Sequence, residues 1–178
     1  MIGNDTTGGV HEVKVGDATP KFRMSFTNDF TQGPWSLHVH ADWQNGGVIS
    51  NLTKLLYDFG SVTADYDAPT GTAGVTVGQR RLTAWLAGQT SNYIETASFL
   101  KLREVSLSYN LPVTMAHRLF GVHSATVSVA ARNLFTIAPY TGLDPEVSNF
   151  GNQPIARNID VAPFPPSRSF WFGVNLGL

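Results

Sequence analysis

Two histidines and an aspartate stand at alternate positions in a short segment of mixed polar and apolar residues. In an extended strand His38, His40 and Asp42 would project from one face, with about 7 Å between successive side chains. Imidazole and carboxylate groups are zinc ligands, so the three could supply a metal site. The sequence offers no further residues to support such ligands. We therefore interpret them, with Gln44, as a polar wall that faces water, and we expect no metal and no cofactor.

A second pair of carboxylates lies in the segment Gly-Leu-Asp-Pro-Glu-Val. Asp144 and Glu146 could serve as the two acids of a glycoside hydrolase. Pro145 between them favours a loop instead, in which an aspartate accepts backbone hydrogen bonds. Arg132 and Asn133, which precede this loop, are the residue types that would anchor it through hydrogen bonds to carbonyl or carboxylate oxygens. We assign all four a structural role.

Other common chemistries lack local support in the sequence. Serine, histidine and aspartate are all present, but no Gly-x-Ser-x-Gly segment presents a nucleophile, and no Gly-rich phosphate loop occurs. There is no cysteine, and 12 basic residues balance 13 acidic ones. Such a balance gives no basic surface for nucleic acid. We predict a protein that is not an enzyme and that does not bind nucleic acid.

Most of the polar residues named above fall in segments whose apolar and polar residues alternate with a period of two. In the last of these segments Phe170, Phe172, Val174 and Leu176 share one parity. Such alternation predicts strands with one apolar and one polar face. The pattern predicts five strands, at about 21–30, 34–45, 98–111, 122–133 and 168–178.

The connections between these strands alternate in length. Those near Gly33 and Gly121 are short, whereas 46–97 and 134–167 are long. Within the first long loop, helical spacing predicts a short helix at about 51–58, and the segment 80–87 could form a second one. Strands of about ten residues with short turns on one side and long loops on the other are typical of transmembrane β-barrels. No apolar run reaches the ~18 residues of a membrane helix.

Aromatic residues near the strand ends allow two interpretations. They could form a platform on which sugars stack, or they could face lipid. They share the parity of the apolar faces, which favours lipid-facing or girdle positions. The residues concerned are Trp35, Trp43, Tyr109, Phe170 and Phe172.

Four motifs, taken in order and spacing, resemble the C-terminal end of SusC/RagA-family TonB-linked (TonB-dependent) outer-membrane receptors. They are GDATPKFRMSFTNDF at 16–30, SFLKLREVSLSYNLP at 98–112, ARNLFTIAPYTGLDPEV at 131–147 and PFPPSRSFWFGVNLGL at 163–178. The resemblance implies a barrel of about 22 strands with an N-terminal plug. It also implies a SusD-like surface lipoprotein as partner, energy from the TonB system, and import of oligosaccharides or peptides across the Gram-negative, Bacteroidetes-like outer membrane.

On this basis we expect an all-β, antiparallel, up-and-down transmembrane β-barrel fragment. Residues 1–178 would be its C-terminal segment of about five strands, in contact with outer-membrane lipid, without signal peptide or plug. His38, His40, Asp42 and Gln44 would face the lumen, and both long loops would be extracellular. The alternative is a soluble β-sandwich that binds carbohydrate, whose apolar strand faces would form a core between two sheets.

Overall fold

The computed structural model describes residues 2–4, 12–146 and 158–178. The chain divides into two compact units. The sheet unit comprises Arg23–Trp43, Phe99–Ile137 and Pro166–Leu178, and the loop unit comprises Met1–Phe22, Gln44–Ser98 and Ala138–Pro165. Each unit is therefore assembled from three separate stretches of the sequence.

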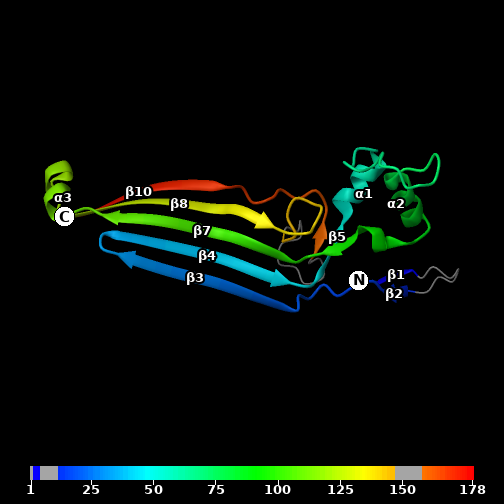
Figure 1. Ribbon diagram of the computed structural model, residues 1–178, viewed down its shortest axis with the longest axis horizontal. Coiled ribbons are helices and arrows are strands. Elements are labelled where there is room, and N and C mark those ends of the chain that lie inside the picture. Colours follow the sequence, from blue (N-terminus) through cyan, green and yellow to red (C-terminus); the bar gives the residue numbers. More distant parts are fainter. Residues whose placement is uncertain (1, 5–11, 147–157) are drawn as a thin grey trace. The chain divides into compact units, whose positions relative to one another are not determined.

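The sheet unit is built on five long strands, in the spatial order β10-β8-β7-β4-β3 (Figure 1). Neighbouring strands run in opposite directions. Each strand lies where the alternation predicts one, with ends that differ by a few residues. The strands are β3 (Phe22–Gln32), β4 (Trp35–Asn45), β7 (Phe99–Asn110), β8 (Ser124–Ile137) and β10 (Ser169–Gly177).

Cross-strand pairing keeps the apolar residues of neighbouring strands on one face of the sheet. In the pairing of β10 with β8, Phe172 lies opposite Val129, and Val129 in turn lies opposite Leu107 of β7. The ring of Trp35 of β4 contacts that of Tyr109 of β7, with centroids 4.5 Å apart and ring planes tilted by 51°. The apolar parities of successive strands thus form one continuous face.

This apolar face is exposed. Among the described residues of the sheet unit no second sheet covers it, so the sandwich core expected of the soluble alternative is not formed. The exposed large side chains on this face are Met24, Phe26, Phe30, Trp35, Trp43, Leu107, Val129, Phe170, Phe172, Val174 and Leu176. An exposed apolar surface of this extent marks a contact with lipid or with another protein.

The sheet is open. In the described part of the chain β10 pairs only with β8, and β3 pairs only with β4, so each has one edge without a strand partner. The chain leaves the sheet by long segments after β4 and β8, and by short ones after β3 and β7. Because neighbouring strands are antiparallel, both long segments leave at the same end of the sheet.

Strand β8 extends four residues beyond its predicted end at Asn133, a correction to the expected loop 134–167. A β-bulge shifts the register with β7 between Leu102 and Glu104, after which pairing continues to Leu100 opposite Ile137. Asn133 takes up the left-handed conformation, with φ of 53°. The bulge breaks the period of two, which is why alternation alone ends the strand too early.

The connection between β7 and β8 contains a helix that the sequence pattern did not predict. Helix α3 (Val113–Phe120) begins after Pro112, whose carbonyl accepts from the amides of Met115 and Ala116. It ends at Gly121, which adopts a φ of 70° that costs glycine little. Proline before and glycine after the helix therefore confine it to eight residues.

The loop unit contains regular structure, most of it in the connection between β4 and β7. A three-stranded sheet has the order β6-β5-β9, and β1 and β2 pair as a two-stranded sheet. The helices are close to their predicted positions, with Asn51 capping the first and Thr76 with Gln79 forming a capping box at the second. The elements are β1 (Ile2–Asn4), β2 (Glu12–Lys14), β5 (Val48–Asn51), α1 (Leu52–Phe59), α2 (Val77–Leu86), the 3-10 helix η1 (Thr90–Tyr93), β6 (Ile94–Thr96) and β9 (Ile159–Asp160).

Few apolar side chains are fully buried in the loop unit. Ile49, Ala97 and Tyr140 form one small cluster, against which Ala138 packs. Several other buried side chains of the loop unit are polar or charged, among them Asn51, Asp58, Arg81 and Asp160. Hydrogen bonds and ion pairs of these residues join its elements. None of the described helices has the length and hydropathy needed to span a bilayer.

Candidate functional site

The polar residues of β4 form cross-strand pairs with β3. His38 Nδ1 lies 2.7 Å from Asp29 Oδ1, and His40 Nδ1 lies 2.9 Å from Thr27 Oγ1. Asp42 accepts hydrogen bonds from Ser25 Oγ at 2.7 Å and from Arg103 Nε at 2.7 Å. The two histidines and Asp42 thus lie in one row on the polar face of the sheet.

Gln44 does not continue this row, which is a correction to the predicted water-facing wall. Its side chain is buried, and its Nε2 donates to the carbonyl of Ala97 at 2.7 Å within the loop unit. The strand passes from the sheet unit to the loop unit at this residue. Within the residues that the structure describes, no group of three or more His, Asp or Glu side chains is arranged to hold a metal ion.

The four residues assigned to loop anchoring lie in two places. Arg132 Nε donates to Glu104 Oε2 on the neighbouring strand at 2.9 Å, within the sheet. Asn133 Nδ2 donates to the carbonyl of Ser167, at the far end of the second long loop, at 3.1 Å. The backbone amide of Glu146 donates to Asp144 Oδ1 at 2.8 Å, so these two residues form a turn.

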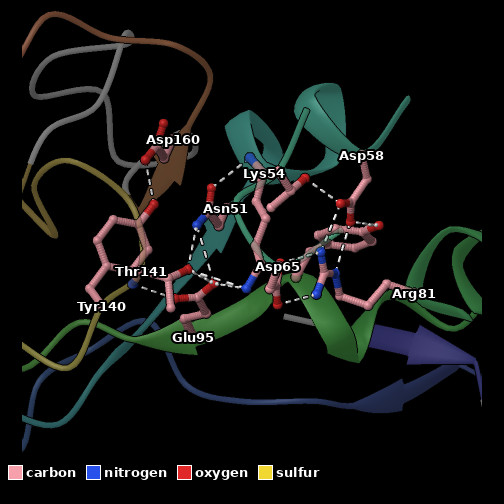
Figure 2. A network of polar contacts seen from close by, with 11 residues as sticks. Asn51, Lys54, Asp58, Asp65, Arg81, Glu95, Tyr140, Thr141 and Asp160 are labelled. Carbon is pink, nitrogen blue, oxygen red and sulfur yellow. Dashed lines mark hydrogen bonds and ion pairs between the residues drawn. The ribbon is translucent and has the colours of Figure 1, made fainter. Parts of the chain in front are cut away.

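A buried ion network joins three elements of the loop unit (Figure 2). Asp58, in the last turn of α1, is fully buried. Arg81 of α2 donates to its two oxygens from Nε at 2.8 Å and from Nη2 at 2.7 Å. Arg81 also forms two bonds of 2.7 and 2.9 Å with Asp65, and the hydroxyl of Tyr93 donates to Asp58 at 2.8 Å. One guanidinium therefore holds two carboxylates.

The network shifts the pKa values of its members. Burial alone would raise the pKa of Asp58. The hydrogen bonds from Arg81, Thr63 and Tyr93, together with the charge of Arg81, outweigh burial and hold the pKa below its ordinary value. The hydrogen bonds to Asp58 raise the pKa of Arg81 despite its burial. Asp58 and Arg81 are therefore both charged at neutral pH.

A second polar network lies beside the first (Figure 2). Glu95 accepts from the backbone amide of Thr141 at 2.8 Å and from its hydroxyl at 2.7 Å. Asn51 and Lys54 also donate to Glu95, at 3.2 and 3.4 Å. Burial raises the pKa of Glu95, but these donors hold it below its ordinary value. The network joins α1 to β6 and to the second long loop.

Tyr140 and Asp160 join the two ends of the second long loop. The hydroxyl of Tyr140 donates to the buried carboxylate of Asp160, which also accepts from Thr53 of α1. Burial is the main cause that raises the pKa of Tyr140, and the hydrogen bond to Asp160 raises it as well. These contacts hold the residues on either side of 147–157 close to the helix.

A pocket of about 560 Å³ opens between these networks in the loop unit. It is of the size that binds small ligands in other proteins. Its lining combines the amine of Lys54, hydroxyl groups, and the apolar side chains of Val62 and Leu143. The residues that line it are Asn51, Thr53, Lys54, Tyr57, Val62, Thr63, Ala64, Asp65, Thr141, Gly142 and Leu143.

Neither polar network, nor the pocket, could be predicted from the pattern of residues. Asp58 and Arg81 are 23 residues apart, and Glu95 and Thr141 are 46 apart, with no repeat to connect them. The only available signal was indirect: the predicted helix at 51–58 ends in an aspartate, and the second predicted helix carries Arg81. The arrangement offers recognition of a ligand by hydrogen bonds and charge.

Known proteins resemble this chain in sequence and in fold. No family model matches the sequence. TonB-dependent receptor P3 of Formosa agariphila is 29% identical over 189 residues, which cover 99% of this chain and 18% of the receptor. TonB-dependent receptor SusC of Bacteroides thetaiotaomicron is 30% identical over 84 residues, which cover 47% of this chain and 8% of SusC. The chain thus spans less than a fifth of the receptors that it matches.

Two solved structures share the fold. The RagAB peptide importer in its 'open-open' state superposes with a TM-score of 0.63 over 98% of this chain and 19% of that one, at 19% identity. The RagAB peptide transporter gives 0.64 over 93% and 18%, at 22% identity. The open antiparallel sheet accordingly resembles part of such a barrel. These relatives confirm the resemblance to SusC/RagA-family TonB-dependent receptors, and the chain is similar along nearly its whole length to a segment of such a receptor.

Proposed function

We propose that the chain supplies part of the barrel wall and of the extracellular loops of an outer-membrane TonB-dependent importer. The observation that carries the proposal is the exposed apolar face that continues across all five strands of the sheet unit. In water such a face would cause the protein to associate with other molecules. In a bilayer an apolar outer face is what a transmembrane barrel needs for contact with the acyl chains. We assign the chain a role in transport and propose no catalytic role for its residues.

The polar face supports the other half of the proposal. His38, His40 and Asp42 lie on the face opposite to the lipid-facing one, which in a barrel is the lumen. Residues of β3 on the same face satisfy their hydrogen bonds, so these polar side chains do not have to meet lipid. The open edges of β3 and β10 would pair with strands that belong to the rest of the receptor.

The loop unit is the part that would meet substrate and partner. Both long segments leave the sheet at one end, as the extracellular loops of outer-membrane barrels do. The importer would work with a SusD-like surface lipoprotein and draw energy from the TonB system. Its cargo would be a peptide or an oligosaccharide; the RagAB structures, which are described as a peptide importer, favour peptide.

The pocket allows a direct test with two alanines of the same long loop. Ala64 lines the pocket and is exposed, so Ala64→Trp fills it without displacing a buried side chain. We expect uptake of the cognate peptide or oligosaccharide at limiting concentration to fall several-fold, while the amount of receptor in the outer membrane is unchanged. The measurement is uptake of labelled substrate by cells that produce each variant.

Ala73→Trp is the matched control, because Ala73 is exposed and lies outside the pocket. Equal uptake by both variants and the unaltered receptor would remove the pocket from the transport path. Deletion of the whole receptor gene should abolish growth on the cognate substrate class; unimpaired growth on every peptide and oligosaccharide tested would contradict the importer assignment itself.

A further inference from the structure

Helix α3 packs on the apolar face of the sheet unit. Ala116, at its centre, is fully buried against Val122 and Ala125, and Leu111 packs beside them. Leu111 and Ala125 are cross-strand neighbours, since the amide of Leu111 donates to the carbonyl of Ala125 at 2.9 Å. Both continue the apolar parities of β7 and β8. The helix therefore covers the end of the face that we assign to lipid.

Four large apolar side chains of α3 remain exposed. Val113, Met115, Leu119 and Phe120 have between 45% and 64% of their surface accessible. At about 3.6 residues per turn, Met115 and Leu119 lie on one flank of Ala116, and Val113 and Phe120 lie on the other. An eight-residue helix that served only to close a turn would not need an apolar flank on each side of its contact with the sheet.

The remaining surface of α3 is polar and basic. Thr114 and Arg118 lie opposite Ala116, and His117 and Arg118 occupy the last turn. The segment 113–120 contains no acidic residue. Apolar flanks beside a basic strip are typical of helices that lie in the membrane interface, where the cations meet lipid phosphates.

The place of α3 in the chain indicates that no further strand of the receptor covers it. It connects β7 and β8, which both have strand partners on each side. The two open edges, where further strands of the receptor would pair, belong to β3 and β10. Strand pairing elsewhere in the receptor thus leaves the outer surface of α3 uncovered.

We infer that α3 is an interfacial helix, which lies at the boundary between lipid headgroups and acyl chains at the short-turn end of the sheet. This inference rests on the proposed function, because it requires the apolar face to contact lipid. Since β7 and β8 already tether both ends of the helix, its ordering is complete before lipid binds. The partner is a phospholipid surface, with phosphate groups near Arg118 and acyl chains against the apolar flanks.

Site-directed spin labels in the intact receptor, reconstituted in phospholipid vesicles, test the inference. This chain has no cysteine, so labels can be placed singly at Met115 and Phe120, one on each flank, once any cysteine elsewhere in the receptor is replaced. The reference positions are Leu107 on the apolar face of β7 and Ala73 in the loop unit. The readout is the ratio of collisions with oxygen, which enters lipid, to collisions with a water-soluble nickel chelate.

We expect a ratio at one or both flanks that is several-fold above that at Ala73 and below that at Leu107. Values equal to Ala73 at both flanks, with Leu107 in lipid, overturn the interfacial helix and leave the proposed function intact. A water-like value at Leu107 overturns the proposed function as well, so the two failures are distinguishable.

Discussion

Leu107→Arg is expected to lower the free energy of unfolding of the intact receptor in lipid vesicles by about 2–4 kcal/mol. Leu107 lies in the middle of β7, opposite Val129, on the exposed apolar face. In the proposed barrel an arginine here would place a charge among acyl chains, where no water is available to solvate it. Denaturant titration of the reconstituted receptor measures the change.

Ser106→Arg provides the matched control. Ser106 precedes Leu107 on the same strand and therefore points to the polar face, opposite Ala130 of β8. The same charge at this position meets the aqueous lumen, and we expect little change in stability. If both variants lose similar stability, or if neither does, the assignment of the two faces to lipid and lumen is wrong.

Arg81→Met is expected to destabilise the loop unit by about 3–5 kcal/mol, since it removes one partner of a buried ion pair and leaves the other. Asp58 would remain fully buried without a counter-charge, while the length of the side chain at position 81 is kept. The expected result is faster amide hydrogen exchange in α1 and α2 of the intact receptor, by at least about a hundredfold.

The destabilisation caused by Arg81→Met should depend on pH, because Asp58 titrates. Asp58 has a lowered pKa in the folded protein, so its contribution to stability is present above its unfolded pKa and is lost as the pH falls through the lower folded value. In Arg81→Met the charge and hydrogen bonds of the guanidinium are lost, and only the hydrogen bonds from Thr63 and Tyr93 still oppose burial. The pKa of Asp58 therefore rises, and its protonation relieves the variant. The difference in exchange between the variant and the unaltered receptor should therefore shrink as the pH is lowered toward about 4.

Arg80→Met is the control for the loss of a positive charge. Arg80 is the neighbouring residue on α2 and is exposed. It should leave the exchange rates nearly unchanged at every pH. A loss of protection as large as that in Arg81→Met would show that the net charge of the helix, rather than the pair with Asp58, stabilises the loop unit.

The strand pattern could be predicted because successive side chains of a strand point to opposite faces, so that one apolar and one polar face give a period of two. Phe170, Phe172, Val174 and Leu176 carry that signal without interruption, and β10 pairs with β8 in regular antiparallel register. The signal fails where the backbone departs from regular pairing. The bulge opposite Leu102 and Glu104 and the left-handed Asn133 hide the last residues of β8.

Helix α3 and the polar networks escaped prediction for different reasons. The helix is only eight residues long, which is shorter than the window of about 11–18 residues in which helical periodicity can be recognised. The pairing of Asp58 with Arg81 depends on how α1 and α2 pack, which no local pattern records. The sequence predicted that both helices exist, and the contact between them could be seen only in the fold.

In the proposed barrel, alternate residues of the five strands face lipid. Photolabelling of the intact receptor in phospholipid vesicles with a membrane-soluble carbene precursor, followed by mass spectrometry of its peptides, tests it most directly. The account predicts label on Phe26, Leu107, Val129 and Phe172, and none on Ser106 or Ser128, which lie on the polar face. Equal labelling of both parities, or no label on any of the five strands, would contradict it.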